Sequence, residues 1–166
     1  RSAFRTKRGG ARLQGQNSHR AGRHGPAVIV FTRPDLPASE ADIVMATHIM
    51  VIDDEQNYLL LLETLLSDED YTVTALQDPQ LALDYLAESE VDVVITDMKM
   101  PHLSGQDVLE HVKKNYPFIP VLIMTAYGSV DGAVQAMKCG AFDYISKPFS
   151  NDELLLSVNK AAKMSY

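Results

Sequence analysis

The chain has 166 residues, of which 46% are hydrophobic, enough for one domain core and an appendage. No apolar run approaches the length of a bilayer span or of a signal-peptide core, and the single cysteine excludes an intramolecular disulfide framework. We therefore expect a soluble, cytoplasmic protein that does not enter a membrane, with Cys139 as a small packing residue.

Charge divides the chain into two segments. Residues 1–46 hold eight Lys or Arg against three Asp or Glu, whereas residues 47–166 hold seven against nineteen. The first segment is rich in Gly, Arg and Ser without apolar periodicity, so we expect a disordered or non-native tail. Its origin stays open among a nucleic-acid arm, a transit peptide and foreign sequence. Met45 would be a sensible native start, which favours foreign sequence. The acidic remainder argues against nucleic-acid binding by the domain itself.

From His48 onward, short apolar runs alternate with segments of helical period. In chain order, the pattern predicts strand 48–53, helix 55–70, strand 71–76, helix 79–89, strand 91–97, helix 106–116, strand 119–126, helix 129–140, strand 142–147 and helix 150–164. Asp78 before Pro79 predicts a helix N-cap, and Gly140 predicts a helix C-terminus. Apolar strands alternating with helices predict an α/β fold with a parallel sheet covered on both faces. Right-handed crossovers favour a doubly wound five-stranded sheet of order 2-1-3-4-5 with five helices.

Complementary polar groups follow four of the predicted strands. Asp53 and Asp54 end the first strand, Asp97 the third, Thr125 the fourth and Lys147 the fifth. The first and third strands are neighbours in the predicted order, so three carboxylates converge on one crevice. Their mutual repulsion is relieved by a hard divalent cation such as Mg²⁺, and Lys147 adds a second positive charge. An aspartate in this setting can be a nucleophile that forms an aspartyl phosphate.

Each of these residues also has an ordinary structural explanation. Asp53 or Asp54 alone could cap the first helix, Lys147 could be a solvated surface charge, and Thr125 could be a β-branched strand residue. The four strand ends taken together are hard to explain in this way, so we favour a functional site.

Four separated motifs, "VIDDE", "VVITDMKMP", "VLIMTAYGS" and "DYISKPF", resemble the receiver domains of two-component response regulators. The longer stretch "TAYGSVDGAVQAMKCGAFDYISKPF", which overlaps the last two, resembles the receivers of NtrC-type transcription activators. The resemblance covers about residues 48–164 and implies a flavodoxin-like receiver domain over 47–166. It implies a signalling switch that takes a phosphoryl group from a sensor histidine kinase. Such a switch is not an enzyme in the usual sense, since it catalyses only its own phosphotransfer and autodephosphorylation.

The resemblance also implies roles for individual residues. Asp97 would be the phosphoacceptor, and Asp53, Asp54 and the main-chain carbonyl of Lys99 would join it in holding Mg²⁺, with Mn²⁺ as a substitute. Thr125 would contact the phosphoryl group and Lys147 would pair with it. Tyr144 matches the aromatic switch position, and the bond before Pro148 would be cis. Phosphorylation would then change the face formed by the fourth helix, fifth strand and fifth helix, which would carry a homodimer contact.

The family's longer members continue into an AAA+ ATPase and a helix-turn-helix DNA-binding domain, and this sequence has no Walker-type phosphate loop. A fragment of a longer regulator and a stand-alone receiver both stay open, with "TAYGSV" favouring the fragment. Two other functions fit the sequence less well. A small-molecule phosphatase with an aspartate nucleophile would need a second acid at position 99, which is Lys, and a degenerate receiver would have lost an acid or the lysine.

Overall fold

The computed structural model describes residues 46–126, 128 and 130–165. The tail predicted over 1–46 lies outside these residues except for Ala46, and so do Tyr127, Ser129 and Tyr166.

All ten predicted elements are present in the described part of the chain and alternate strictly. The strands and helices are β1 (His48–Ile52), α1 (Gln56–Asp68), β2 (Thr72–Leu76), α2 (Pro79–Glu88), β3 (Val93–Asp97), α3 (Gly105–Asn115), β4 (Val121–Thr125), α4 (Val130–Lys138), β5 (Asp143–Ser146) and α5 (Asn151–Met164). The boundaries differ from the prediction by a few residues, because apolar periodicity marks buried positions rather than the last backbone hydrogen bond.

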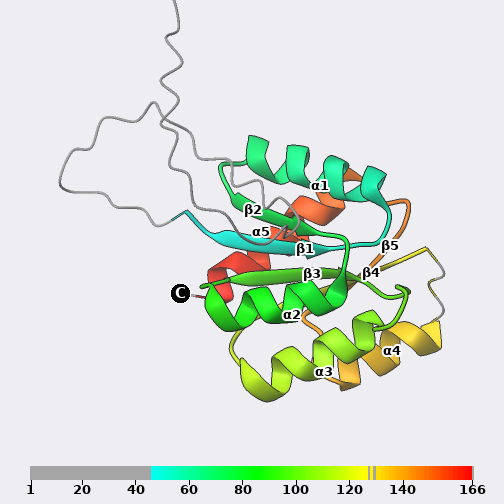
Figure 1. Cartoon of the computed structure of the whole chain (residues 1–166). Coiled ribbons are helices and arrows are strands. Elements are labelled where there is room, and N and C mark those ends of the chain that lie inside the picture. Colours follow the sequence, from blue (N-terminus) through cyan, green and yellow to red (C-terminus); the bar gives the residue numbers. More distant parts are fainter. Residues whose placement is uncertain (1–45, 127, 129, 166) are drawn as a thin grey trace, which may run out of the picture.

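The five strands form one parallel sheet of order β2-β1-β3-β4-β5, which confirms the predicted topology. In Figure 1, α1 and α5 cover one face of this sheet, whereas α2, α3 and α4 cover the other. Because all strands run in one direction, their carboxyl ends lie along one edge, and β1 and β3 are adjacent at its centre.

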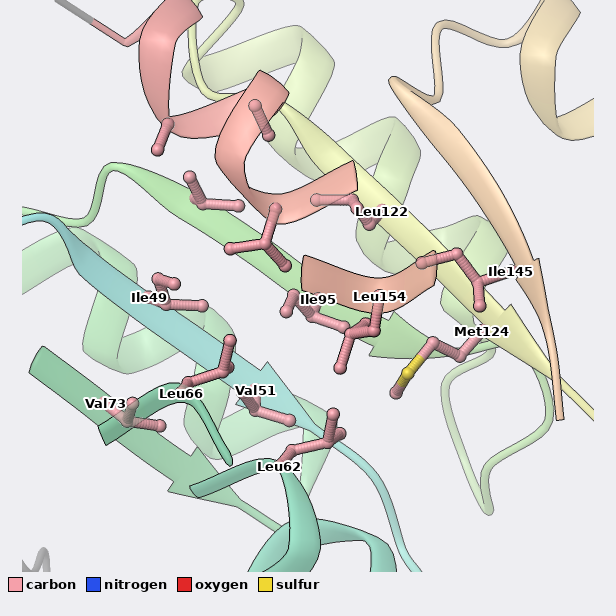
Figure 2. Packing of buried hydrophobic residues seen from close by; sticks show 14 of the residues in the cluster. Ile49, Val51, Leu62, Leu66, Val73, Ile95, Leu122, Met124, Ile145 and Leu154 are labelled. Atoms are coloured by element: carbon pink, nitrogen blue, oxygen red, sulfur yellow. The ribbon is translucent and has the colours of Figure 1, made fainter. Parts of the chain in front are cut away.

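Side chains that alternate along each strand divide between two cores. Ile49, Val51 and Ile95 point into the core beneath α1 and α5, which also holds Leu62 and Leu154 (Figure 2). The residues between them pack beneath α2, α3 and α4 in the second core. The central strands β3 and β4 are buried at every position, which accounts for the apolar runs VVI and VLIM that open them.

Local signals in the sequence set several helix ends. The Asp78 side chain accepts a hydrogen bond from the backbone N–H of Gln80 at the start of α2, which confirms the predicted cap. Gly140, just after α4, has a φ of 98°, a left-handed conformation that glycine adopts without strain. None of the described helices combines the length and apolarity needed to cross a bilayer.

Candidate functional site

Three carboxylates from two adjacent strands lie together at the carboxyl edge of the sheet. Asp97 is the last residue of β3, and Asp53 and Asp54 directly follow β1. One oxygen from each side chain can be chosen so that all three lie within 4.8 Å of one another. Asp53 and Asp97 are buried, whereas Asp54 is exposed. The adjacency of β1 and β3 therefore brings together the three acids that the sequence placed in one crevice.

Neither of the first two acids caps α1, so the ordinary explanation for them is wrong. The residue before the helix is Glu55, and it makes no side-chain capping hydrogen bond. Asp53 instead accepts a hydrogen bond through Oδ1 from the backbone N–H of Glu55 at 2.9 Å. This bond orients the carboxylate and leaves its other oxygen directed at a cation.

That cation is the buried side chain of Lys147, the first residue after β5. Its Nζ lies 2.6 Å from Asp53 Oδ2, 3.2 Å from Asp97 Oδ1 and 3.5 Å from Glu55 Oε1. Lys147 is only 6% exposed, so the ordinary explanation of a solvated surface lysine is wrong as well. One ammonium group thus links the acid that follows β1 with the acid that ends β3.

The backbone around Lys147 fixes the position from which its side chain reaches inward. Its N–H donates to the carbonyl of Thr125 at 2.7 Å, which extends the pairing of β5 with β4. The Lys147–Pro148 peptide bond is cis, the geometry that the resemblance implied. Ser150 then caps α5 by accepting from the N–H of Glu153.

Burial and charge perturb the titration of these groups. Burial raises the pKa of both Asp53 and Asp97, even though hydrogen bonding and the charge of Lys147 act to lower it. Burial alone would lower the pKa of Lys147, but its hydrogen bond to Asp53 and the charges of Asp53 and Asp97 raise it. The lysine therefore stays protonated at neutral pH, while the two buried carboxylates are short of compensating positive charge.

The described donor set fits a hard divalent cation. Carboxylate oxygens are the ligands that Mg²⁺ prefers, and two of these three acids are poorly hydrated. The exposed Asp54 leaves one side of the cluster open to water or to a phosphoryl group.

Thr125 and Tyr144 line one cavity. The cavity has a volume of about 530 Å³, and its lining includes Thr125 at the end of β4, Tyr144 of β5 and Lys99 of the β3–α3 loop. Thr125 is buried and Tyr144 is partly buried. The structure thus brings the two predicted switch residues to a common space, which is also bordered by α3 and α4 through Gln106 and Gln135.

Two residues at the site were missed by the sequence reasoning. The Tyr58 ring of α1 lies over the Lys147 ammonium, 3.9 Å from Nζ to the ring centroid. Gly105 opens α3 directly against Asp97, where an added Cβ would lie 2.2 Å from the Asp97 carbonyl oxygen. The Ser104-Gly105 pair at a helix start was a usable signal for the glycine, whereas Tyr58 carried no local signal because it sits in an ordinary helical pattern.

Comparisons with known proteins identify the family of this fold. Residues 49–159 match the family described as response regulator receiver domain. The chain is 41% identical over 113 residues to the transcriptional regulatory protein ZraR of Klebsiella oxytoca, covering 68% of this chain and 26% of that protein. It is 37% identical over 113 residues to the DNA-binding transcriptional regulator NtrC of Escherichia coli (strain K12), covering 68% and 24% respectively.

A solved structure extends the comparison to three dimensions. The beryllofluoride-activated NtrC4 receiver domain dimer superposes with a TM-score of 0.69 at 31% identity, covering 72% of this chain and 98% of that one. The chain spans about a quarter of the length of the curated relatives it matches. It belongs to the response regulator receiver domain family, whose members are phosphorylation-dependent signalling switches, and its relatives are regulators of the NtrX, NtrC, AtoC and ZraR type.

Proposed function

We propose that this chain is a switch that accepts a phosphoryl group on Asp97 from a sensor histidine kinase. The observation that carries the proposal is the position of Lys147, whose buried ammonium contacts both Asp53 and Asp97 within one acidic cluster. A lone buried acid would remain protonated and a poor nucleophile, whereas an adjacent cation favours its charged form.

In the transfer step, a carboxylate oxygen of Asp97 forms a bond to phosphorus. The bond between phosphorus and the donor breaks, and the electron pair leaves with the donor's nitrogen or oxygen. Lys147 lies close enough to Asp97 to pair with an oxygen of the incoming group, and the Thr125 hydroxyl would contact another. These groups hold the phosphoryl group in position and neutralise the charge of its oxygens, which is most of what phosphoryl transfer requires.

The side chains of Asp53, Asp54 and Asp97 would hold Mg²⁺, together with the main-chain carbonyl of Lys99, and Mn²⁺ would substitute. When bound, the metal supplies positive charge for the phosphoryl oxygens. The same site would catalyse slow loss of the phosphoryl group, which makes the chain a self-resetting switch rather than an enzyme with a separate substrate.

We propose that phosphorylation changes the face formed by α4, β5 and α5, and that this change controls an output domain. Thr125 and Tyr144 line one cavity with residues of α3 and α4, so a movement of Thr125 toward a phosphoryl group would open space for Tyr144. Only one side chain of α4, Ala136, is fully buried among its described residues, whereas Val130, Val134 and Met137 are exposed. This weakly packed helix suits a two-state element, and its apolar surface suits a homodimer contact in one state.

The output would be control of transcription through an AAA+ ATPase and a DNA-binding domain in a longer protein. The proposal is supported by relatives that are transcription regulators about four times as long as the matched segment.

We place the receiver at 47–166 in the cytoplasm and regard residues 1–46 as a dispensable tail. Truncation of the tail should then leave the melting temperature and the phosphorylation rate unchanged.

Incubation with acetyl phosphate, with and without Mg²⁺, followed by intact mass measurement tests the proposed chemistry. A receiver should gain the mass of one phosphoryl group only when Mg²⁺ is present. A degenerate receiver would gain nothing in either condition. A phosphatase would instead hydrolyse many phosphate esters without accumulating the labelled form.

A further inference from the structure

The aromatic ring of Tyr58 covers the Lys147 ammonium, which contacts the acidic cluster. Tyr58 lies in the first turn of α1 and is partly buried, and the Lys147 Nζ is 3.9 Å from its ring centroid. A protonated amine at this distance from a ring face is attracted by the electron density of the ring. The contact joins α1 to Lys147, the residue that follows β5. The strand before α1 is β1, and it is not paired with β5 in the sheet.

The other contacts of the ammonium leave its position incompletely fixed. Asp53 and Asp97 hold it on the side of the sheet, at 2.6 and 3.2 Å. The third carboxylate, Glu55, is 3.5 Å away and its side chain is 56% exposed, so it restrains the lysine weakly. A lysine has a flexible four-carbon stem, so a further group outside the carboxylates would restrict its rotation toward water.

Tyr58 supplies that group, and a second ring supports it. The ring of Phe149, two residues after Lys147, lies 6.2 Å from the Tyr58 ring with the planes tilted by 45°. One ring therefore comes from α1 and the other from the segment that carries the lysine. The Lys147 side chain is only 1% exposed beneath the Tyr58 ring, and its low exposure to water strengthens the attraction of the ammonium to nearby negative charge.

We propose that Tyr58 is a positioning residue for phosphoryl transfer, which holds Lys147 over the acceptor site through its ring face. The inference rests on the proposed function, since the lysine is held for a phosphoryl group on Asp97. The alternative is that Tyr58 only packs α1 against Phe149, in which case any apolar side chain of similar size would serve.

The test compares Tyr58→Leu, which keeps apolar bulk without a ring, with Tyr58→Phe, which keeps the ring without the hydroxyl. We expect phosphoryl uptake from acetyl phosphate at saturating Mg²⁺ to fall about tenfold in Tyr58→Leu and to stay within about twofold of wild type in Tyr58→Phe. Mg²⁺ affinity, measured by calorimetry, should be unchanged in Tyr58→Phe because the ring still holds Lys147 and Tyr58 offers the metal no carboxylate. Leu60→Ala, at a 63% exposed position of the same helix, is the control and should match wild type.

A spectroscopic readout separates positioning from packing. The ε-methylene protons of Lys147 should be shifted upfield by the ring current in wild type and Tyr58→Phe, and this shift should vanish in Tyr58→Leu. Equal uptake rates in wild type and Tyr58→Leu would overturn the inference, and so would a Tyr58→Phe variant as slow as Tyr58→Leu. If the wild-type chain itself takes up no phosphoryl group, the proposed function fails and the positioning role fails with it.

Discussion

Lys147 lies closer to Asp53 than to Asp97, with its ammonium 2.6 Å from the first carboxylate and 3.2 Å from the second. In the unphosphorylated chain the lysine therefore serves as the counterion of the acid that follows β1. In the proposed reaction it must also pair with a group on the acid that ends β3. A divalent cation held by the same acids would make this sharing possible, because it would neutralise Asp53 in place of the lysine.

This arrangement predicts how Lys147 and Mg²⁺ compensate for each other. Lys147→Met should lower the free energy of unfolding by about 3 kcal/mol without metal, because two buried carboxylates lose their cation. Saturating Mg²⁺ should raise the melting temperature of this variant more than that of wild type. Lys160→Met, at an exposed position of α5, is the control for loss of a lysine and should respond as wild type does. Equal Mg²⁺-dependent stabilisation of wild type and Lys147→Met would contradict the account.

Without metal, the buried carboxylate of Asp97 should lower the stability of the chain at neutral pH. Burial raises the pKa of Asp97, so the folded state binds a proton more readily than the unfolded state does. This contribution favours folding at low pH and is lost as the pH rises from the ordinary aspartate range through the raised pKa. Asp97→Asn should therefore raise the melting temperature at pH 7 in the presence of EDTA, and the gain should shrink as the pH falls toward about 4.

The same thermal scans contain their own controls. Asp84→Asn, at an exposed position of α2, should show no such pH-dependent gain. Saturating Mg²⁺ should reduce or reverse the gain in melting temperature of Asp97→Asn. The metal stabilises the charged carboxylate of the wild-type chain, whereas the amide of the variant is a weaker ligand. An Asp97→Asn chain that is less stable than wild type in EDTA at every pH would show that the Lys147 contact outweighs the cost of burial.

Gly105 should be required for the geometry of the acceptor. An alanine Cβ there would lie 2.2 Å from the Asp97 carbonyl oxygen and 2.9 Å from Met98 Cα, so the end of β3 or the start of α3 must shift. We expect Gly105→Ala to lower stability by about 1–3 kcal/mol and to slow phosphoryl uptake. Ser104→Ala removes the hydrogen bond from the Asp107 N–H to the cap of α3 at a cost of about 1 kcal/mol, and should leave uptake nearly unchanged. Uptake lost equally in both variants would indicate a general effect of destabilising α3.

The sequence was sufficient for the fold because each strand carries its own signal. The runs in β1, β3 and β4 are apolar at almost every position, which is typical of strands buried on both faces, and right-handed crossovers leave few orders for five of them. The convergence of Asp53, Asp54 and Asp97 followed from the same topology, since it depends only on which strands are adjacent.

What could not be predicted were contacts made by rotamers across the crevice. Tyr58 lies on Lys147 because α1 approaches the segment after β5 at a particular distance, and no spacing within α1 encodes that distance. The stronger contact of Lys147 with Asp53 than with Asp97 is also a matter of side-chain geometry within one cluster. Backbone topology brings residues to an edge, whereas packing decides which of them touch.

Phosphorylation should alter α4 and its surroundings rather than the acceptor alone. Amide hydrogen exchange, with and without beryllofluoride as a mimic of the aspartyl phosphate, should show changed protection across α4 and β5 as well as around Asp97. The physical reason is that α4 has little buried surface and borders the cavity shared by Thr125 and Tyr144. Changes confined to the loops around Asp97, with α4 unaffected, would contradict the proposed route from the site to the surface.

The identity of the phosphoacceptor is the central claim, and chemical trapping tests it most directly. After phosphorylation with acetyl phosphate and Mg²⁺, borohydride reduces an aspartyl phosphate to homoserine, which peptide mass spectrometry can locate. The account predicts homoserine at position 97, its absence in Asp97→Asn, and its retention at 97 in the Asp84→Asn control. Homoserine at position 53 or 54 in the wild-type chain, or full labelling of Asp97→Asn, would contradict the assignment of Asp97.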